Sequence, residues 1–186
     1  MYQGYSTLMQ FKTNHAILPR SLCKPHLPMI AHLLIFLCTL VAMEGVGTLA
    51  HKYIMHGPGW WLHRSHHEAH LGTLEANDVY LLVLALAAIG LMVLGDPVVQ
   101  CIGAGAAAYG VIYVVFHDGL VHRHWPVRPS PRHPYLLRLY QAHLMHHAIK
   151  SRRNSVSFGF LYAPSQATLN AQVQASGGLV PSGEAV

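Results

Sequence analysis

Three long apolar runs place the strongest constraint on how this 186-residue chain can fold. They cover residues 27–43, 79–95 and 98–116, each 17 to 19 residues long, and their only strongly polar side chains are His32 and Gln100. That length is at the lower end of what spans a bilayer as a helix. A soluble protein can bury one such run, but three would leave too little polar sequence to cover them. We therefore predict an all-α, integral-membrane helical bundle.

The composition agrees with a membrane protein. Apolar residues make up 52% of the chain, against 12 basic and 7 acidic residues. The formal charge of +5 lies on no soluble basic module, so it predicts membrane orientation and contact with lipid rather than nucleic-acid binding. Three scattered cysteines indicate neither a disulfide framework nor a CxxC metal site.

The chain is expected to form one domain between two tails. Residues 1–28 are predicted to be a disordered basic tail, residues 29–164 the membrane domain with its histidine-rich cap, and residues 165–186 a disordered C-terminal tail. The first apolar run continues as helix beyond residue 43 without a clear cleavage site, so it does not resemble a signal peptide.

Helices are expected at residues 27–53, 79–94, 98–116 and 135–149. The second and third form a hairpin across Gly95, Asp96 and Pro97, and small residues in the third favour close helix packing. The fourth is predicted to be an amphipathic helix at the membrane surface.

The hairpin also predicts the topology. It returns the chain to the side from which it entered, so the histidine-rich segments 51–70 and 117–147 should face one compartment. Seven basic residues between 123 and 153 predict that this compartment is the cytoplasm, and hence a multi-pass protein of the cell inner membrane. Three basic residues in the N-terminal tail oppose that orientation and leave its side open.

Ten of the sixteen histidines fall into four ordered groups with the spacings HxxxxH, HxxHH, HxxxxH and HxxHH. A chain with this histidine content would contain HxxHH by chance about 0.12 times, so two copies are a specific signal. The predicted metal ligands are His51, His56, His63, His66, His67, His117, His122, His143, His146 and His147.

Helix geometry explains these spacings. In HxxHH the intervals i,i+3 and i,i+4 return to one face of a helix. Five residues overshoot an α-helical turn by roughly 140°, so each HxxxxH pair either serves two different metals or requires a π-bulge or unwinding. Ten imidazoles exceed the capacity of one ion, and we predict two ions with about five ligands each.

Four residues are candidates to support the ligands. Glu44 lies two helical turns before His51, and a carboxylate in an apolar helix is costly unless it is used. It could orient an imidazole or form an interhelical hydrogen bond. Asn77 and Asp78 either support the site or cap a helix, and Asp118 adjoins His117.

The remaining histidines are predicted not to bind metal. They are His15, His26, His32, His70, His124 and His133.

The four histidine groups resemble those of the membrane fatty-acid-hydroxylase and sterol-desaturase superfamily. Neighbouring residues resemble the bacterial-type β-carotene 3-hydroxylases more closely, over about residues 30–164. The segments that carry this likeness are 50–57, 65–68, 75–80, 117–122 and 157–164.

The resemblance implies a non-haem diiron monooxygenase that uses O2 as co-substrate. It implies two Fe ions as cofactor, a carotenoid substrate taken from the bilayer, and a ferredoxin with its reductase as electron donor. The reaction implied is 3-hydroxylation of β-carotene through β-cryptoxanthin to zeaxanthin, and conversion of canthaxanthin to astaxanthin stays open. The resemblance implies no catalytic side chain beyond the metal ligands.

Two alternatives remain at this stage. One is another membrane diiron oxidase, such as a ketolase, a desaturase or a fatty-acid or sterol hydroxylase. The other is a membrane metal transporter or store, which would require ligands along a path through the bilayer. Imidazole suits Fe, Zn, Cu and Ni, so the ligand type alone does not select the metal.

Overall fold

The computed structural model describes residues 27–68, 74–126 and 130–177, which form an all-helical fold. The predicted tail at residues 1–28 lies outside the described residues except for its last two. The elements in chain order are α1 (Met29–Ala50), the π-helix η2 (His51–Met55), α2 (Trp60–His63), the 3-10 helix η3 (Arg64–His67), α3 (Asp78–Leu94), α4 (Pro97–Tyr113), the π-helix η4 (Val114–Val121), α5 (Pro134–Ala148) and α6 (Gln166–Ala175).

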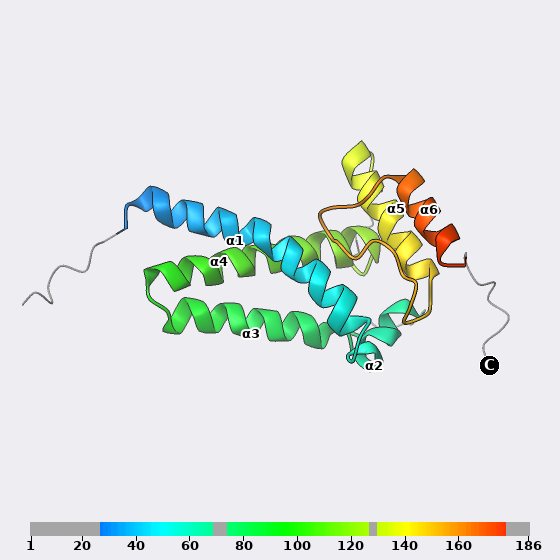
Figure 1. Cartoon of the computed structure of the whole chain (residues 1–186). Coiled ribbons are helices and arrows are strands. Elements are labelled where there is room, and N and C mark those ends of the chain that lie inside the picture. Colours follow the sequence, from blue (N-terminus) through cyan, green and yellow to red (C-terminus); the bar gives the residue numbers. More distant parts are fainter. Residues whose placement is uncertain (1–26, 69–73, 127–129, 178–186) are drawn as a thin grey trace, which may run out of the picture.

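Three long helices, α1, α3 and α4, lie alongside one another and form the membrane bundle (Figure 1). Helix α1 with η2 is 27 residues long and α4 with η4 is 25, both long and apolar enough to cross a membrane, and the apolar α3 has 17 residues. Large side chains on α1 are exposed, including Met29 at 87% and Val41 at 73%. Such continuous apolar surface is unfavourable in water, so it faces lipid and the prediction of a membrane bundle is confirmed.

The predicted hairpin is present, and its turn begins α4. The Asp96 side chain accepts hydrogen bonds from the backbone N–H groups of Val98 and Val99 at 2.9 and 3.1 Å. Pro97 occupies the first helical position, where a missing N–H costs nothing. The turn lies at the end of the bundle farthest from α5 and α6 (Figure 1).

Two glycines let α4 pack closely against both of its neighbours. A Cβ at Gly103 would lie 2.8 Å from the Ala88 carbonyl oxygen of α3, and one at Gly105 would lie 2.7 Å from the Phe36 oxygen of α1. The predicted role of small residues in close packing is therefore confirmed.

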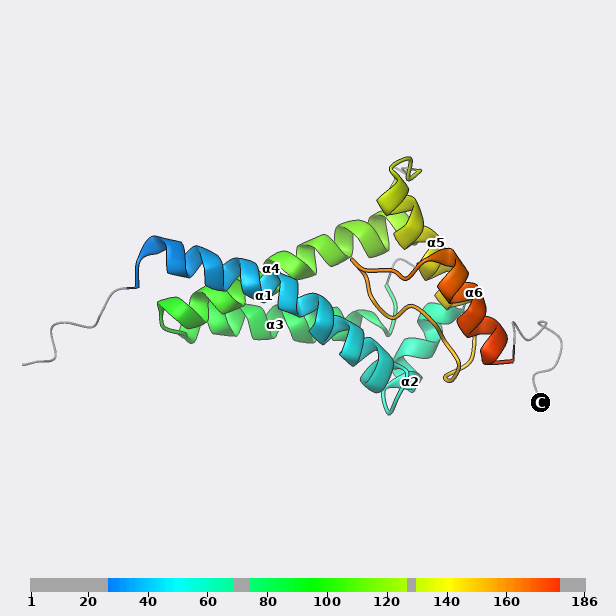
Figure 2. The same ribbon diagram turned by 45° about the horizontal axis from the view of Figure 1, so that its top comes forward.

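Helices α5 and α6 form a cap at the other end. Helix α5 lies where it was expected, and its Leu139 and Ala142 pack in a small core with Leu169 and Val173 of α6. The segment between the two helices extends toward α1 and α4 before it returns to α6 (Figure 2). The prediction of disorder over residues 165–186 is wrong for Gln166–Ala175, because two buried apolar side chains one turn apart dock that helix; residues 178–186 lie outside the described part.

Candidate metal centre

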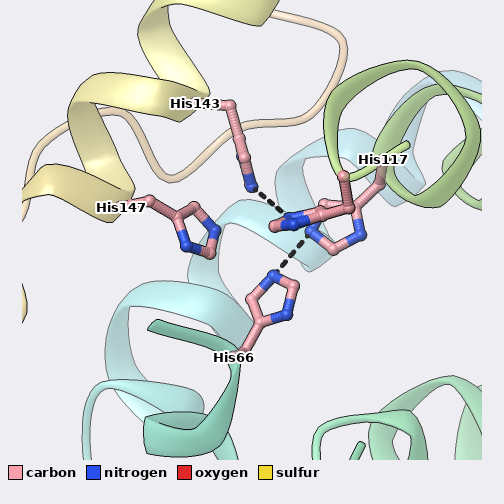
Figure 3. A group of neighbouring side chains, drawn as sticks. His66, His117, His143 and His147 are labelled. Carbon is pink, nitrogen blue, oxygen red and sulfur yellow. Dashed lines mark hydrogen bonds between the residues drawn. The ribbon is translucent and has the colours of Figure 1, made fainter. Parts of the chain in front are cut away.

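Nine of the ten predicted ligands converge in two neighbouring groups at the capped end of the bundle. Within each group one ligand nitrogen per residue lies within 4.8 Å of every other. The first group contains His51, His56, His63 and His146, and the second contains His66, His117, His122, His143 and His147. Figure 3 shows four members of the second group pointing inward from three different segments. Both histidine-rich halves of the sequence therefore meet at one end, as the hairpin predicted.

Each HxxxxH pair lies on a π-helix. The N–H of His56 donates to the carbonyl of His51 at 3.0 Å, and that of His122 donates to His117 at 2.9 Å. These i to i−5 bonds widen the helix so that residues five apart face the same way. Both members of each pair consequently belong to one group, which confirms the predicted π-bulge and favours a single metal for each pair.

The HxxHH triplets are divided between the two groups. His63 ends α2 and joins the first group, whereas His66 lies on η3 and joins the second. On α5, His146 points to the first group, and His143 and His147, one turn apart, point to the second. Each triplet therefore bridges the two groups, which holds them next to each other.

His67 is the predicted ligand that belongs to neither group. It is buried, and its Nε2 lies 3.2 Å from Nε2 of His63. It therefore borders the first group, but it does not satisfy the criterion that one ligand nitrogen lies within 4.8 Å of those of all other members.

Six of the ten imidazoles have their Nδ1 fixed by an oxygen. The backbone carbonyls of Phe158, Arg152 and Val156 accept from His51, His56 and His146 at 2.9, 3.2 and 2.8 Å. Side-chain oxygens of Asn77, Glu75 and Asp118 accept from His63, His66 and His117 at 2.7, 2.9 and 2.7 Å. In each ring the Nδ1 therefore carries the proton, and Nε2 offers a lone pair.

This tautomer shows that the donor set fits a metal ion. Nε2 of His56 and Nε2 of His146 lie 3.1 Å apart, although the proton of each ring is committed to a backbone carbonyl. Two lone pairs at that distance repel unless a cation lies between them. The pairs His51–His63, at 3.1 Å, and His66–His117, at 2.9 Å, present the same arrangement. The buried Nε2 of His147 has no hydrogen-bond partner among the described residues, as expected for a ligand atom.

Burial keeps these imidazoles neutral. It lowers the pKa of His56 to about 4 and that of His67 to about 3, with neighbouring histidines adding to the effect. Burial also lowers the pKa values of His66, His143 and His146 well below the usual range. Neutral imidazole is the form that binds metal, so the cluster is prepared for cations at neutral pH.

The expectation that Glu44 orients an imidazole directly is wrong. Its Oε1 accepts the backbone N–H groups of residues 160–162 at 2.9 to 3.0 Å, and its Oε2 accepts from Tyr109 of α4 at 3.0 Å. The alternative of an interhelical hydrogen bond is therefore confirmed. The bound segment begins two residues after Phe158, whose carbonyl accepts from His51, so Glu44 holds the backbone next to this contact.

The other supporting candidates differ in their roles. Asn77 and Asp118 accept from ligand imidazoles, whereas Asp78, the first residue of α3, accepts at 2.9 Å the backbone N–H of Glu75, which precedes the helix. Asn77 occupies the N-cap position of α3 without a side-chain capping bond. Its side-chain oxygen instead accepts the Nδ1 proton of His63.

Glu75 is the supporting residue that the sequence reasoning missed. It is buried, with a side-chain exposure of 5%, and it holds His66. Its position just before Asn77 was a signal, since a carboxylate in a histidine-rich segment is a common partner of a ligating imidazole. The backbone carbonyl partners carry no signal in the sequence.

The histidines predicted not to bind metal are absent from both groups where they are described. His32 lies on α1, His133 caps α5 through the Tyr135 N–H, and His124 lies 3.8 Å from Glu75. The remaining three, at positions 15, 26 and 70, lie outside the described residues.

An apolar cavity of about 510 Å³ extends through the membrane bundle to residues that contact the centre. Residues of α1 line one side and residues of α3 the other, with Tyr109 and Tyr113 of α4 between them. Its inner end packs against the predicted ligands, because the ring of Tyr113 stacks on that of His117 and the ring of Phe160 on that of His51. The ring centroids lie 4.4 and 5.2 Å apart, respectively. Asn77 and Asp118 lie in the same wall.

The fold and the site define a class of protein: a membrane helical bundle capped by a buried, all-histidine site that can bind metal. The chain is 51% identical over 144 residues to the β-carotene hydroxylase of Pantoea ananas, covering 76% of this chain and 82% of that one. It is 47% identical over 155 residues to the β-carotene hydroxylase of Paracoccus sp. (strain PC1), covering 81% and 96%.

A plant relative, the chloroplastic β-carotene 3-hydroxylase 1 of Arabidopsis thaliana, is 38% identical over 133 residues, which is 68% of this chain and 42% of the plant protein. No family model and no solved structure matches the chain. The chain belongs to the β-carotene hydroxylase family.

Proposed function

We propose that this protein is a membrane monooxygenase that hydroxylates C3 of carotenoid β-rings, taking β-carotene through β-cryptoxanthin to zeaxanthin. The reaction is R–H + O2 + 2e⁻ + 2H⁺ → R–OH + H2O. The observation that carries the proposal is the apolar cavity whose inner wall, formed by residues such as Tyr113 and Phe160, packs against the two histidine groups. The identity to β-carotene hydroxylases over most of the chain supports the same substrate class.

The cavity suits a long hydrocarbon that arrives from lipid. It lies between α1 and α3, whose outer faces carry the exposed apolar side chains, and its volume falls in the usual range for small-molecule sites. Val83, Leu84 and Ala87 offer contacts to a ring without hydrogen-bonding groups. Tyr113 and Phe160 form the wall next to the ligands and would fix how far the ring advances.

We propose two iron ions as the cofactor, held by the two histidine groups with His67 as a further ligand of the first. Iron bound there would supply the dioxygen activation that cleavage of an unactivated C–H bond requires. The chain's own contribution is to hold the imidazoles in one tautomer through oxygens such as those of Glu75 and Asp118. It also limits the access of water, because eight of the ten histidines are buried.

We further propose that the protein is a multi-pass protein of the cell inner membrane with its metal centre on the cytoplasmic side. The capped end carries exposed basic residues, among them Lys52, Arg64, Lys150 and Arg153. The positive-inside rule assigns that end to the cytoplasm. A ferredoxin with its reductase would then reach the centre from the cytoplasm.

Pigment analysis tests the proposal. The full chain is produced in cells that make β-carotene, and the carotenoids are separated by chromatography. We expect β-cryptoxanthin and zeaxanthin, and expect neither with the His66→Ala variant. Accumulation of β-carotene alone with the unaltered chain, or of ketolated products only, would refute the proposed activity.

A further inference from the structure

A second hollow lies beside the metal centre and is more polar than the apolar cavity. It has a volume of about 700 Å³ and shares no lining residue with the apolar cavity. Its walls are the outer face of η2, the segment 152–159 and the residues Gln172 and Ser176 at the end of α6. We refer to it as the basic cleft.

The basic cleft carries positive charge that has no acidic partner among the described residues. Lys52, Arg152 and Arg153 line it and are exposed, and its lining contains no aspartate or glutamate. Within the described part of the chain, none of the three forms an ion pair with a carboxylate. Arg64 and Glu68 form an exposed ion pair at this end of the molecule, and it lies outside the cleft.

Two ligands of the first histidine group reach this surface through hydrogen bonds. His56 itself lines the cleft; its Nδ1 donates to the Arg152 carbonyl at 3.2 Å, and Arg152 Nε donates to the His56 carbonyl at 3.1 Å. His51 Nδ1 donates at 2.9 Å to the carbonyl of Phe158, which also lines the cleft. The cleft is therefore lined by one predicted ligand, His56, and by a residue that is hydrogen-bonded to a second one, His51.

We propose that the basic cleft is the docking surface for an acidic one-electron carrier protein of the ferredoxin class. This inference rests on the proposed function, because that reaction consumes two electrons from outside the chain. Two reduced carriers, one O2, one R–H and two protons give two oxidised carriers, R–OH and one H2O. An acidic carrier matches the unpaired positive charge, and docking here brings it next to His56. Anionic lipid headgroups would match the charge as well, but they supply no electrons.

The test measures binding of a reduced plant-type [2Fe–2S] ferredoxin to the purified, metal-loaded full chain in phosphatidylcholine nanodiscs. Lys52→Glu and Arg153→Glu reverse charge in the cleft, singly and together, and leave Arg152 with its bonds to His56 intact. Arg138→Glu is the matched control, because it makes the same change on the exposed side of α5 outside the cleft. Metal content and helicity are measured for every variant.

We expect the double variant to weaken ferredoxin binding roughly tenfold or more and to flatten its salt dependence. The control should keep the affinity for ferredoxin and its salt dependence. In turnover with the double variant, the KM for ferredoxin should rise while the KM for β-carotene stays unchanged. Equal weakening by the control, or unchanged binding in the double variant, would overturn the inference. If the double variant bound ferredoxin as well as the unaltered chain does, but phosphatidylglycerol no longer stabilised it, the cleft would instead be assigned to lipid headgroups. Absence of hydroxylated product from the unaltered chain refutes the proposed function, which is a separate result from the binding measurement.

Discussion

Nδ1 of His66 donates to a buried carboxylate oxygen of Glu75 at 2.9 Å, and the bond fixes both the tautomer and the direction of Nε2. The same logic holds for His117 with Asp118 and for His63 with Asn77. Glu75 and Asn77 lie outside the histidine motifs, whereas Asp118 lies within the third one. For six of the ten predicted ligands, the functional unit is therefore a pair of residues: an imidazole and the oxygen that accepts its Nδ1 proton.

Glu75→Gln is expected to lower metal affinity, and with it hydroxylation, by about 10- to 100-fold, because an amide accepts the His66 proton more weakly than a carboxylate. Glu68→Gln is the matched control, since Glu68 is 54% exposed and pairs with Arg64 on the surface. Competition with a metal-binding dye measures the affinity. Equal effects of the two substitutions would contradict the assigned role of Glu75.

The metal-free protein is expected to lose stability as the pH falls from about 6.5 towards 4. The folded state holds the pKa of His56 at about 4 and that of His67 at about 3, so between these values and the ordinary imidazole pKa the unfolded chain binds more protons. The stability that the two neutral, buried imidazoles contribute is present above pH 6.5 and is lost as the pH falls. Circular dichroism in detergent should show Tm falling by at least about 2–4 °C, equivalent to about 1 kcal/mol. A Tm that stays constant over this range would contradict the burial of neutral imidazoles.

At the residue level, the sequence could predict the ligands better than their partners. Two copies of HxxHH, each after HxxxxH, reveal a metal site because spacing and count are properties of the chain alone. Glu44 was given the wrong partner, because whether a buried carboxylate meets an imidazole or three backbone N–H groups depends on where residues 160–162 return in space. Carbonyl partners such as that of Val156 cannot be predicted from side-chain identity.

At the element level, the two π-helices are the devices that make the HxxxxH spacing usable. An α-helix would turn the second histidine of each pair roughly 140° away, whereas η2 and η4 return it to the same group. The need for a local irregularity could be predicted from this conflict between spacing and helix geometry. Helix α6 could not, because its Ser, Gln and Ala composition resembles a disordered tail and its order comes from packing on α5.

Leu169→Ala is expected to destabilise the cap by about 2–5 kcal/mol, because the side chain is only 1% exposed and its loss leaves a cavity between α6 and α5. Metal content should fall as well, since α5 carries three ligands. Gln174→Ala, on the exposed side of α6, serves as the control. Thermal unfolding in detergent measures the change, and a stability equal to that of the control would show that α6 does not support the cap.

At the level of the whole molecule, the hairpin of α3 and α4 brings together histidines more than fifty residues apart, and α4 separates α1 from α3 enough to leave the apolar cavity. The bundle and the common end of the histidine segments could be predicted from the apolar runs. The cavity could not, because its shape depends on helix separation and on side chains such as Tyr109 and Tyr113.

Ala87→Phe is expected to fill the cavity from α3 and to lower kcat/KM for β-carotene by roughly tenfold or more, while metal content stays unchanged. Ala85→Phe makes the same substitution on the same helix at an exposed position outside the cavity lining. Product formation in nanodiscs compares the two variants. If Ala85→Phe impaired turnover as much as Ala87→Phe, the cavity would not be the substrate site.

Iron quantification on the purified full chain tests the central claim most directly, because each of the two histidine groups is proposed to hold one ion. After anaerobic loading with Fe²⁺ and removal of excess metal, elemental analysis should give about two irons per chain. His146→Ala removes a ligand of the first group and His143→Ala one of the second, and each should lower that number towards one. A stoichiometry that varies with metal supply, or two irons retained in both variants, would contradict a histidine-ligated two-iron centre.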